Sequence, residues 1–173
     1  MKDSLANIRL LLLDVDGVLT DGSIMYQADG TEIKCFNAKD GLGIRLLMES
    51  GIQVGIVTGR SSPALIQRCR NLGISLIFDG VKDKGAVLED IMSQTGVSAE
   101  ETAFAGDDLP DIGLMRRVGF SAAVADAHEA VRQEAAMVTV REGGRGAVRE
   151  ICEAILKARG AWEKTVEGFR CVR

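Results

Sequence analysis

The strongest constraint on the fold is a short, near-continuously apolar segment, Ile8 to Leu13, which ends directly in acidic residues and a glycine. A strand with almost only apolar residues must be buried on both faces, which is typical of a central strand in a parallel sheet. The segment therefore predicts an α/β protein in which other elements cover both faces of the sheet.

Similar apolar segments recur along the chain and alternate with longer amphipathic stretches, as parallel strands alternate with crossover helices. Five further strands are predicted: Gln53 to Val57, Leu76 to Phe78, Thr102 to Ala105, Ser121 to Val124 and, more weakly, Met137 to Val140. Helices are predicted at about 40–50, 61–72, 83–95, 108–117, 127–133 and 145–158. The expected fold is a three-layer, Rossmann-like parallel sheet with helices on both faces.

One segment departs from this alternation, directly after the first strand. Two short strand-like stretches flank Ala28-Asp29-Gly30, and Asp-Gly is a strong turn signal for a hairpin. A β-hairpin over about residues 22–37 is therefore predicted as an insertion. The chain is expected to form a single core domain over residues 1–160, followed by a tail over 161–173 without clear periodicity.

Charge and hydropathy exclude several classes of partner. The net charge of −4 argues against nucleic acid, because nucleic-acid-binding proteins usually carry a basic surface. A small anionic substrate remains compatible, since it needs only local positive charge. The longest apolar run near the N-terminus, Leu10 to Leu13, is too short for a secretion signal or a membrane span. We therefore expect a cytoplasmic protein without a membrane partner.

The chemistry of the chain is first indicated by Asp14 and Asp16. They follow the first strand and stand two positions apart, so their side chains can share one face. Ligands of open α/β sheets bind at the carboxyl ends of the strands. Two carboxylates at the end of an apolar strand repel each other unless a cation or a proton offsets the repulsion. Because oxygen-only ligands favour magnesium, the pattern predicts a Mg²⁺ site.

The segment Asp14 to Gly22, DVDGVLTDG, resembles the first motif of the haloacid dehalogenase superfamily, whose general form is DxDGxxxD. Three more stretches resemble the other superfamily motifs in the same order. Thr58-Gly59 resembles the second motif, Lys84 the third and Asp107-Asp108 the fourth. Lys82 is a competing candidate for the third motif, and the expected start of a helix favours Lys84.

This resemblance implies a magnesium-dependent phosphatase that works by two-step phosphoryl transfer. It makes Asp14 the nucleophile and Asp16 the acid and then the base. Thr58 and Lys84 are the residues that it implies for holding the transferred phosphoryl group. The implied metal residues are Asp14, Asp16 through its backbone carbonyl, Asp107, and Asp108 through a metal-bound water.

The spacing of the motifs indicates a subgroup. About 42 residues separate Asp16 from Thr58 and about 26 separate Thr58 from Lys84, which leaves no room for a separate cap domain. The closer resemblance is to the capless, tetrameric 3-deoxy-D-manno-octulosonate 8-phosphate phosphatases and related sugar-acid phosphatases. It extends over about residues 8–156 and includes FNAKDGLGIR at 36–45, VADAH at 124–128 and GGRGAVRE at 143–150. It implies a homotetramer and a role in lipopolysaccharide precursor synthesis. Contacts between subunits are expected through the hairpin, because a small element cannot bury all of its apolar residues, Ile24, Tyr26, Ile33 and Phe36.

The subgroup also implies a substrate with a carboxylate besides its phosphate, and arginine suits both anions through its paired donors. Arg60 follows the Thr-Gly pair at a position where nonulosonate 9-phosphate relatives tend to carry glutamate, which favours the octulosonate substrate. The substrate-binding residues implied are Asp16, Asn37, Ala38, Lys39, Asp40, Gly41, Arg45, Thr58, Gly59, Arg60, Arg68 and Lys84.

Two alternatives remain open at this point. The first is a phosphatase that acts on nonulosonate 9-phosphate or on a broad range of sugar phosphates. The second is a non-catalytic oligomerisation or regulatory module, which is disfavoured because none of the motif residues is missing. The glycine-rich stretch 143–146 has two interpretations as well: a bend near a neighbouring subunit's site, or an ordinary loop before the last predicted helix.

Overall fold

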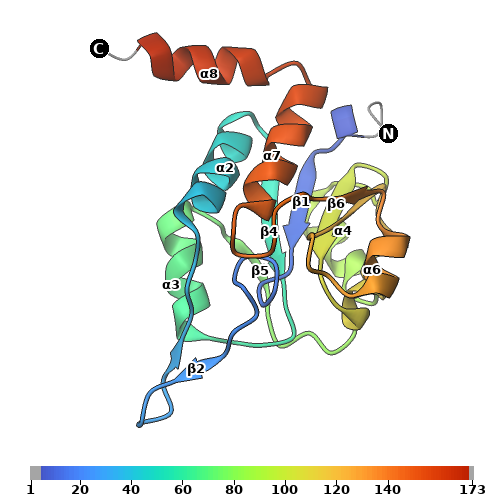
Figure 1. The fold of residues 1–173 in the computed structure, drawn as a ribbon. Coiled ribbons are helices and arrows are strands. Elements are labelled where there is room, and N and C mark those ends of the chain that lie inside the picture. Colours follow the sequence, from blue (N-terminus) through green and yellow to red (C-terminus); the bar gives the residue numbers. More distant parts are fainter. Residues whose placement is uncertain (1–4, 172–173) are drawn as a thin grey trace.

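The computed structural model describes residues 5–171 and contains a six-stranded sheet in which all neighbouring strands run parallel (Figure 1). The strand order is β5-β4-β1-β6-β7-β8. The strands are β1 (Leu10–Leu13), β4 (Gln53–Val57), β5 (Leu76–Phe78), β6 (Thr102–Gly106), β7 (Phe120–Ala123) and β8 (Met137–Val138). The predicted fold class is confirmed, and a strand is present at each of the six predicted positions.

Strand β1 lies at the centre of the sheet, as its apolar sequence predicts. Its four leucines are completely buried, and each contributes roughly 2 kcal/mol to folding by leaving water. Leu13 lies opposite Ile56 of β4 on one side and Ala105 of β6 on the other. The residues that follow these three positions therefore reach the same edge of the sheet, where open α/β sheets bind ligands.

Helices α2 and α7 pack closely because small and capping residues lie between them. A Cβ atom on Gly43 would lie 2.9 Å from Cδ of Arg149, so a larger residue would force the helices apart. The Asp40 carboxylate of α2 accepts a hydrogen bond from the Arg149 backbone N–H at 2.7 Å, in the first turn of α7. The helices are α2 (Ala38–Glu49), α3 (Pro63–Leu72), α4 (Leu88–Thr95), α5 (Ile112–Met115), α6 (Glu129–Glu134), α7 (Ala147–Ala158) and α8 (Trp162–Cys171).

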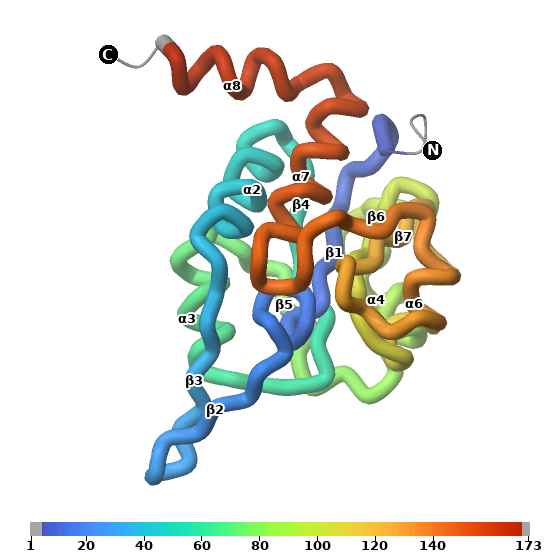
Figure 2. Tube along the Cα trace, viewed as in Figure 1, coloured from blue at the N-terminus to red at the C-terminus, as the bar shows by residue number. Residues whose placement is uncertain are grey.

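The predicted hairpin is present but has shorter strands, β2 (Met25–Tyr26) and β3 (Glu32–Ile33). Its turn is closed by Asp29, whose side chain accepts a hydrogen bond from the Thr31 N–H at 2.9 Å. The hairpin projects away from the sheet (Figure 2). It exposes the apolar residues Ile24, Met25, Tyr26 and Ile33. The expected exposure of Phe36 is wrong, because Phe36 is partly buried against the core.

Two helical predictions differ from the structure. Helix α4 begins at Leu88 instead of about residue 83, because the Asp83 side chain holds a turn by accepting the N–H groups of Gly85 and Ala86. The helix predicted at 108–117 is divided into a 3₁₀ turn, η1 (Leu109–Asp111), and the short α5.

The tail without clear periodicity forms helix α8, which crosses the end of α7 (Figure 2). Its first residue is Trp162, whose ring centroid lies 5.6 Å from Cζ of Arg149 and 5.3 Å from Nζ of Lys157, as in cation–π contacts. Residues 172–173 of the predicted tail and 1–4 of the predicted core lie outside the described residues. Within residues 5–171, every helix is too short or too polar to span a lipid bilayer.

The described residues contain no cap domain. Between β1 and β4 they form the hairpin and α2, and between β4 and β5 they form α3. The short intervals between the motifs are therefore filled by the hairpin and by helices that flank the sheet.

The glycine-rich stretch 143–146 packs on the loop that follows β1 in the same chain. A Cβ atom on Gly143 would lie 1.6 Å from the carbonyl oxygen of Gly17, closer than any substituent can approach. Gly144 has a positive φ of 62° and donates its N–H to the Val18 carbonyl at 2.9 Å. This contact fixes the loop that carries the acidic motif.

We expect Gly143→Ala to displace this loop and to lower the free energy of unfolding by about 1–3 kcal/mol, the usual cost of overpacking. Urea unfolding measures the change. Gly168→Ala is a matched control, because a Cβ atom at position 168 meets nothing within 4 Å. Equal stability of the Gly143→Ala variant and the wild type would contradict the close packing of the two loops.

Candidate active site

A cavity of about 440 Å³ opens at the carboxyl edge of β1, β4 and β6. Asp14 follows β1, Thr58 follows β4 and Asp107 follows β6, so three neighbouring strands each bring one polar residue to it. The catalytic and metal residues predicted from the four motifs thus reach one place. The lining includes Asp14, Asp16, Thr58, Gly59, Arg60, Lys82, Lys84, Asp107, Asp108 and Asp111.

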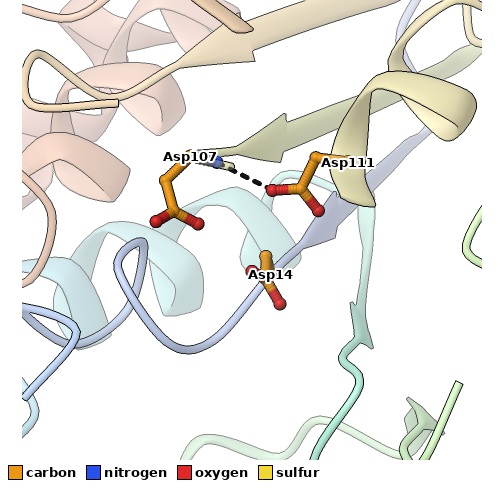
Figure 3. A group of neighbouring side chains, drawn as sticks. All are labelled: Asp14, Asp107 and Asp111. Carbon is orange, nitrogen blue, oxygen red and sulfur yellow. Dashed lines mark hydrogen bonds between the residues drawn. The ribbon is translucent and has the colours of Figure 1, made fainter. Parts of the chain in front are cut away.

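Three carboxylates form the acidic centre of the cavity: Asp14, Asp107 and Asp111 (Figure 3). Each offers one oxygen, and these oxygens lie within 4.8 Å of one another. Gly17 allows this approach, because a Cβ atom there would lie 2.0 Å from Oδ2 of Asp107. The glycine of the DVDG motif is therefore needed for its φ of 89° and for the space it leaves to Asp107.

Asp111 was not among the predicted site residues, although it is almost completely buried. Its Oδ2 accepts the backbone N–H groups of Asp107 at 2.8 Å and Asp108 at 3.2 Å, and so shapes the loop after β6 (Figure 3). The Asp108 side chain accepts the Leu109 N–H at 2.8 Å and caps η1. The signal for Asp111 was the spacing of a capping box, an N-cap residue followed by an acid three positions later.

Lys84 is the cation of the acidic centre. Its Nζ lies 2.8 Å from Oδ1 of Asp14 and 2.6 Å from Oδ1 of Asp111. Burial acts to lower the pKa of Lys84, but the two carboxylates outweigh it and raise the pKa above its usual range. Lys82, the competing candidate, lines the cavity but is exposed.

The acidic centre carries more negative than positive charge. Burial raises the pKa of Asp14 to about 6, against the opposing effect of Lys84. Burial and the neighbouring carboxylates of Asp14 and Asp111 raise the pKa of Asp107 to about 8. Such a group of carboxylates is stable only with a bound proton or a cation, and its oxygen-only donors fit a hard divalent ion such as Mg²⁺.

A second charged group connects the hairpin to the cavity. Lys34, just after β3, forms ion pairs with Asp16 and, at 2.7 Å, with Oε1 of Glu32. Oε2 of Glu32 accepts a hydrogen bond from Arg60 at 2.8 Å, and the Tyr26 hydroxyl accepts one from Arg60 at 3.0 Å. The hydrogen bond with Glu32 is the main reason why the pKa of Arg60 is raised.

Sequence reasoning missed Glu32 and Lys34. Their signal was modest: two opposite charges two positions apart on a strand next to the acidic motif, which places both side chains on one face. Burial acts to lower the pKa of Lys34, but hydrogen bonds with Asp16 and Glu32 outweigh it and raise the pKa.

The remaining predicted substrate residues lie around the start of α2, outside the lining of the described cavity. The Asn37 side chain caps α2 by accepting the Lys39 N–H at 2.8 Å, and Asp40 caps α7 as described above. Arg68 donates to the Asn37 carbonyl at 3.1 Å and lies over the Phe36 ring. Ala38 and Lys39 begin α2, Gly41 packs against Arg68, and Arg45 is exposed on α2. Their assignment to the substrate stays a prediction.

Comparisons with known proteins agree with this fold and site. The family model of haloacid dehalogenase-like hydrolases matches residues 74–151. A 3-deoxy-D-manno-octulosonate 8-phosphate phosphatase of Haemophilus influenzae is 45% identical over 98% of this chain and 95% of its own length. The corresponding phosphatase of Escherichia coli K12 is 47% identical over 89% of this chain and 82% of its own length.

Solved structures give the same result. The Moraxella catarrhalis phosphatase, crystallised with a magnesium ion, a phosphate ion and a KDO molecule, superposes with a TM-score of 0.95 at 41% identity, covering 97% of each chain. The Yersinia pestis phosphatase has a TM-score of 0.92 at 45% identity, covering 94% of this chain and 88% of its own. This chain therefore belongs to the haloacid dehalogenase-like hydrolases and, among them, to the 3-deoxy-D-manno-octulosonate 8-phosphate phosphatase family, as its motifs predicted.

The raised pKa values predict how stability depends on pH in the absence of metal. The folded pKa of Asp107, about 8, exceeds its ordinary value of 3.8, so the folded state binds more protons between these values. The contribution of Asp107 to stability is therefore lost as pH rises through this window. Asp107→Asn cannot ionise, so the metal-free variant should exceed the wild type in stability near pH 8 by about 1–3 kcal/mol, after allowance for solvent screening.

Urea unfolding in chelator, from about pH 4 to pH 8, measures this difference, which should shrink toward the acid end. Excess Mg²⁺ at the alkaline end should stabilise the wild type more than the variant, because it binds the ionised carboxylates. Identical pH dependence of the two proteins would show that Asp107 does not carry the repulsion.

Proposed function

We propose that the protein hydrolyses the phosphomonoester of 3-deoxy-D-manno-octulosonate 8-phosphate in a magnesium-dependent reaction, through a phosphoryl group held on Asp14. The observation that carries the proposal is the position of Asp14: it lies at the end of β1, next to Lys84 and Asp107, in an open cavity. The names of the similar phosphatases, and the magnesium, phosphate and KDO in one of their structures, support the choice of substrate and metal.

In the first step, a carboxylate oxygen of Asp14 attacks phosphorus and the bond from phosphorus to the sugar oxygen breaks. Asp16 donates a proton to the leaving oxygen, and the sugar acid departs with its hydroxyl restored. In the second step, Asp16 accepts a proton from water while the water oxygen attacks phosphorus. The bond between phosphorus and Asp14 breaks, inorganic phosphate leaves, and both aspartates return to their initial state.

The other residues of the cavity bind and orient. The Lys84 ammonium and the Thr58 hydroxyl would hold the phosphoryl oxygens, where negative charge is concentrated. Asp14, Asp107 and the Asp16 backbone carbonyl would hold Mg²⁺, which offsets the repulsion between the anionic nucleophile and the anionic phosphate. Asp111 would orient the loop that carries Asp107, and the predicted role of Asp108 toward a metal-bound water remains part of the proposal.

Arg60 is proposed to bind the substrate carboxylate, with Arg45, Arg68 and residues 37–41 shaping the rest of the site. Its guanidinium lines the cavity and is held by Glu32, so a substrate anion would meet an arginine that is already oriented. A nonulosonate 9-phosphate or a broad set of sugar phosphates is the alternative substrate range. The presence of the predicted catalytic and metal residues in one cavity counts against a non-catalytic module.

Assembly and location are proposed on the same basis. We propose a cytoplasmic homotetramer that joins subunits through the hairpin and supplies a precursor of lipopolysaccharide. Residues 1–160 would form the phosphatase core and 161–173 an appended tail. The apolar side chains exposed on the hairpin support such contacts, since exposed apolar surface often marks an interface.

The first test of the proposal is phosphate release from 3-deoxy-D-manno-octulosonate 8-phosphate and from nonulosonate 9-phosphate. We expect a preference for the former, loss of activity in chelator, and a fall in kcat of at least about 10³-fold in Asp14→Asn. Asp90→Asn, the same change at an exposed position of α4, should keep wild-type activity. Preference for the nonulosonate would overturn the role given to Arg60. Absence of metal-dependent release from either substrate would overturn the enzymatic proposal.

A second test concerns the tetramer. Light scattering should give four times the mass of the chain, and Ile24→Lys in the hairpin should produce smaller species because it places charge in the proposed interface. Val140→Lys is the control, since Val140 is 88% exposed and lies outside the hairpin. A monodisperse monomer would contradict the proposed assembly.

A further inference from the structure

We propose that Lys34 is a positioning residue for Asp16: its buried ammonium anchors one carboxylate oxygen of Asp16 and leaves the other oxygen to exchange the proton. The inference rests on the acid–base role proposed above for Asp16. It adds a residue outside the four motifs, contributed by the hairpin of the same chain.

The first support is the burial and pairing of Lys34. Its side chain is only 2% exposed, an environment that a lysine rarely occupies without partners. Both partners are carboxylates: Oδ1 of Asp16 and Oε1 of Glu32, the latter at 2.7 Å. A flexible, strongly hydrated side chain has thus been desolvated in order to join these two acids.

The second support is the difference in hydrogen bonding between the two carboxylate oxygens of Asp16. Oδ1 accepts the hydrogen bond from Lys34, whereas Oδ2 is buried and has no hydrogen-bond partner among the described residues. Nε of Arg60 lies 3.6 Å from Oδ2, which is an ion-pair contact beyond hydrogen-bond range. One oxygen is therefore fixed by Lys34, whereas the other has no hydrogen-bond partner of its own and is the one left to exchange a proton.

The third support is the excess of negative charge that would remain around Asp16 if Lys34 were removed. Asp16 and Glu32 would then face each other with Arg60 as their shared cation, and Arg60 already donates to Glu32 and Tyr26. Like charges in a partly buried place repel strongly, so the Asp16 carboxylate would turn away from its present position. Lys34 thus keeps Asp16 apart from the acidic centre around Asp14, where a free carboxylate would compete for the metal.

The experiment compares Lys34→Met, Lys34→Gln and Lys34→Arg with the wild type on two substrates that both lack a carboxylate. One is a simple alkyl phosphate, whose leaving oxygen needs a proton, and the other is an aryl phosphate, whose leaving oxygen departs without one. The value of kcat/KM reports the steps up to cleavage of the bond from phosphorus to that oxygen, so the ratio between the substrates isolates proton donation.

We expect Lys34→Met and Lys34→Gln to lower kcat/KM for the alkyl phosphate by about 10- to 100-fold, and for the aryl phosphate by less than about threefold. Lys34→Arg should restore the alkyl value to within about fivefold of the wild type, because it keeps the cation. Lys157→Met, on the exposed side of α7, should leave both values unchanged. Circular dichroism identifies a variant that does not fold. The other neutral variant then supplies the ratio of kcat/KM between the two substrates.

An equal fall for both substrates, or a ratio in Lys34→Arg as low as in the neutral variants, would overturn the role of Lys34 and leave the proposed function intact. Absence of magnesium-dependent release by the wild type from 3-deoxy-D-manno-octulosonate 8-phosphate, measured alongside, would overturn the proposed function, and the inference with it. The two failures are therefore distinguishable.

Discussion

The physical constraint that the rest of the structure must satisfy is the electrostatic repulsion among three buried carboxylates. Asp14, Asp107 and Asp111 come within 4.8 Å of one another and share Lys84 as their cation. Burial makes the excess negative charge costly, as the raised pKa values of Asp14 and Asp107 indicate. A site that stores this repulsion favours a divalent cation, which would also offset the negative charge of a bound phosphate, and the repulsion lowers stability when no cation is bound.

The rest of the fold holds the acidic centre together against this cost. The leucines of β1 anchor Asp14 in the middle of the sheet, and the parallel register with β4 and β6 brings Thr58 and Asp107 to the same edge. Gly143 and its neighbours press on the loop after β1 at distances that admit no side chain. Precision at the site is thus supplied by backbone packing, and the hairpin adds a second, separately charged group around Asp16.

Sequence reasoning could predict whatever depends on local pattern. Apolar runs located the six strands, Asp-Gly located the hairpin, and the motif at Asp14 located the acidic centre. It could not predict which side chains would pair across the fold. The roles of Asp111 and Lys34 follow from their ion pairs with Lys84 and Asp16, which lie far away in the sequence. Asp40 caps a helix that begins more than one hundred residues later. Helix α8 was missed although its apolar residues Trp162, Val166 and Phe169 recur at helical spacing.

The central claim is that Asp14 accepts the phosphoryl group in this environment. The most direct measurement is an acid-quenched single turnover with radiolabelled 3-deoxy-D-manno-octulosonate 8-phosphate, followed by mass spectrometry of the labelled peptide. The mechanism predicts a transient, hydroxylamine-sensitive label on Asp14 that forms with Mg²⁺ and is absent in chelator. Release of phosphate at the wild-type rate without label on Asp14, or an undiminished rate in Asp14→Asn, would contradict it.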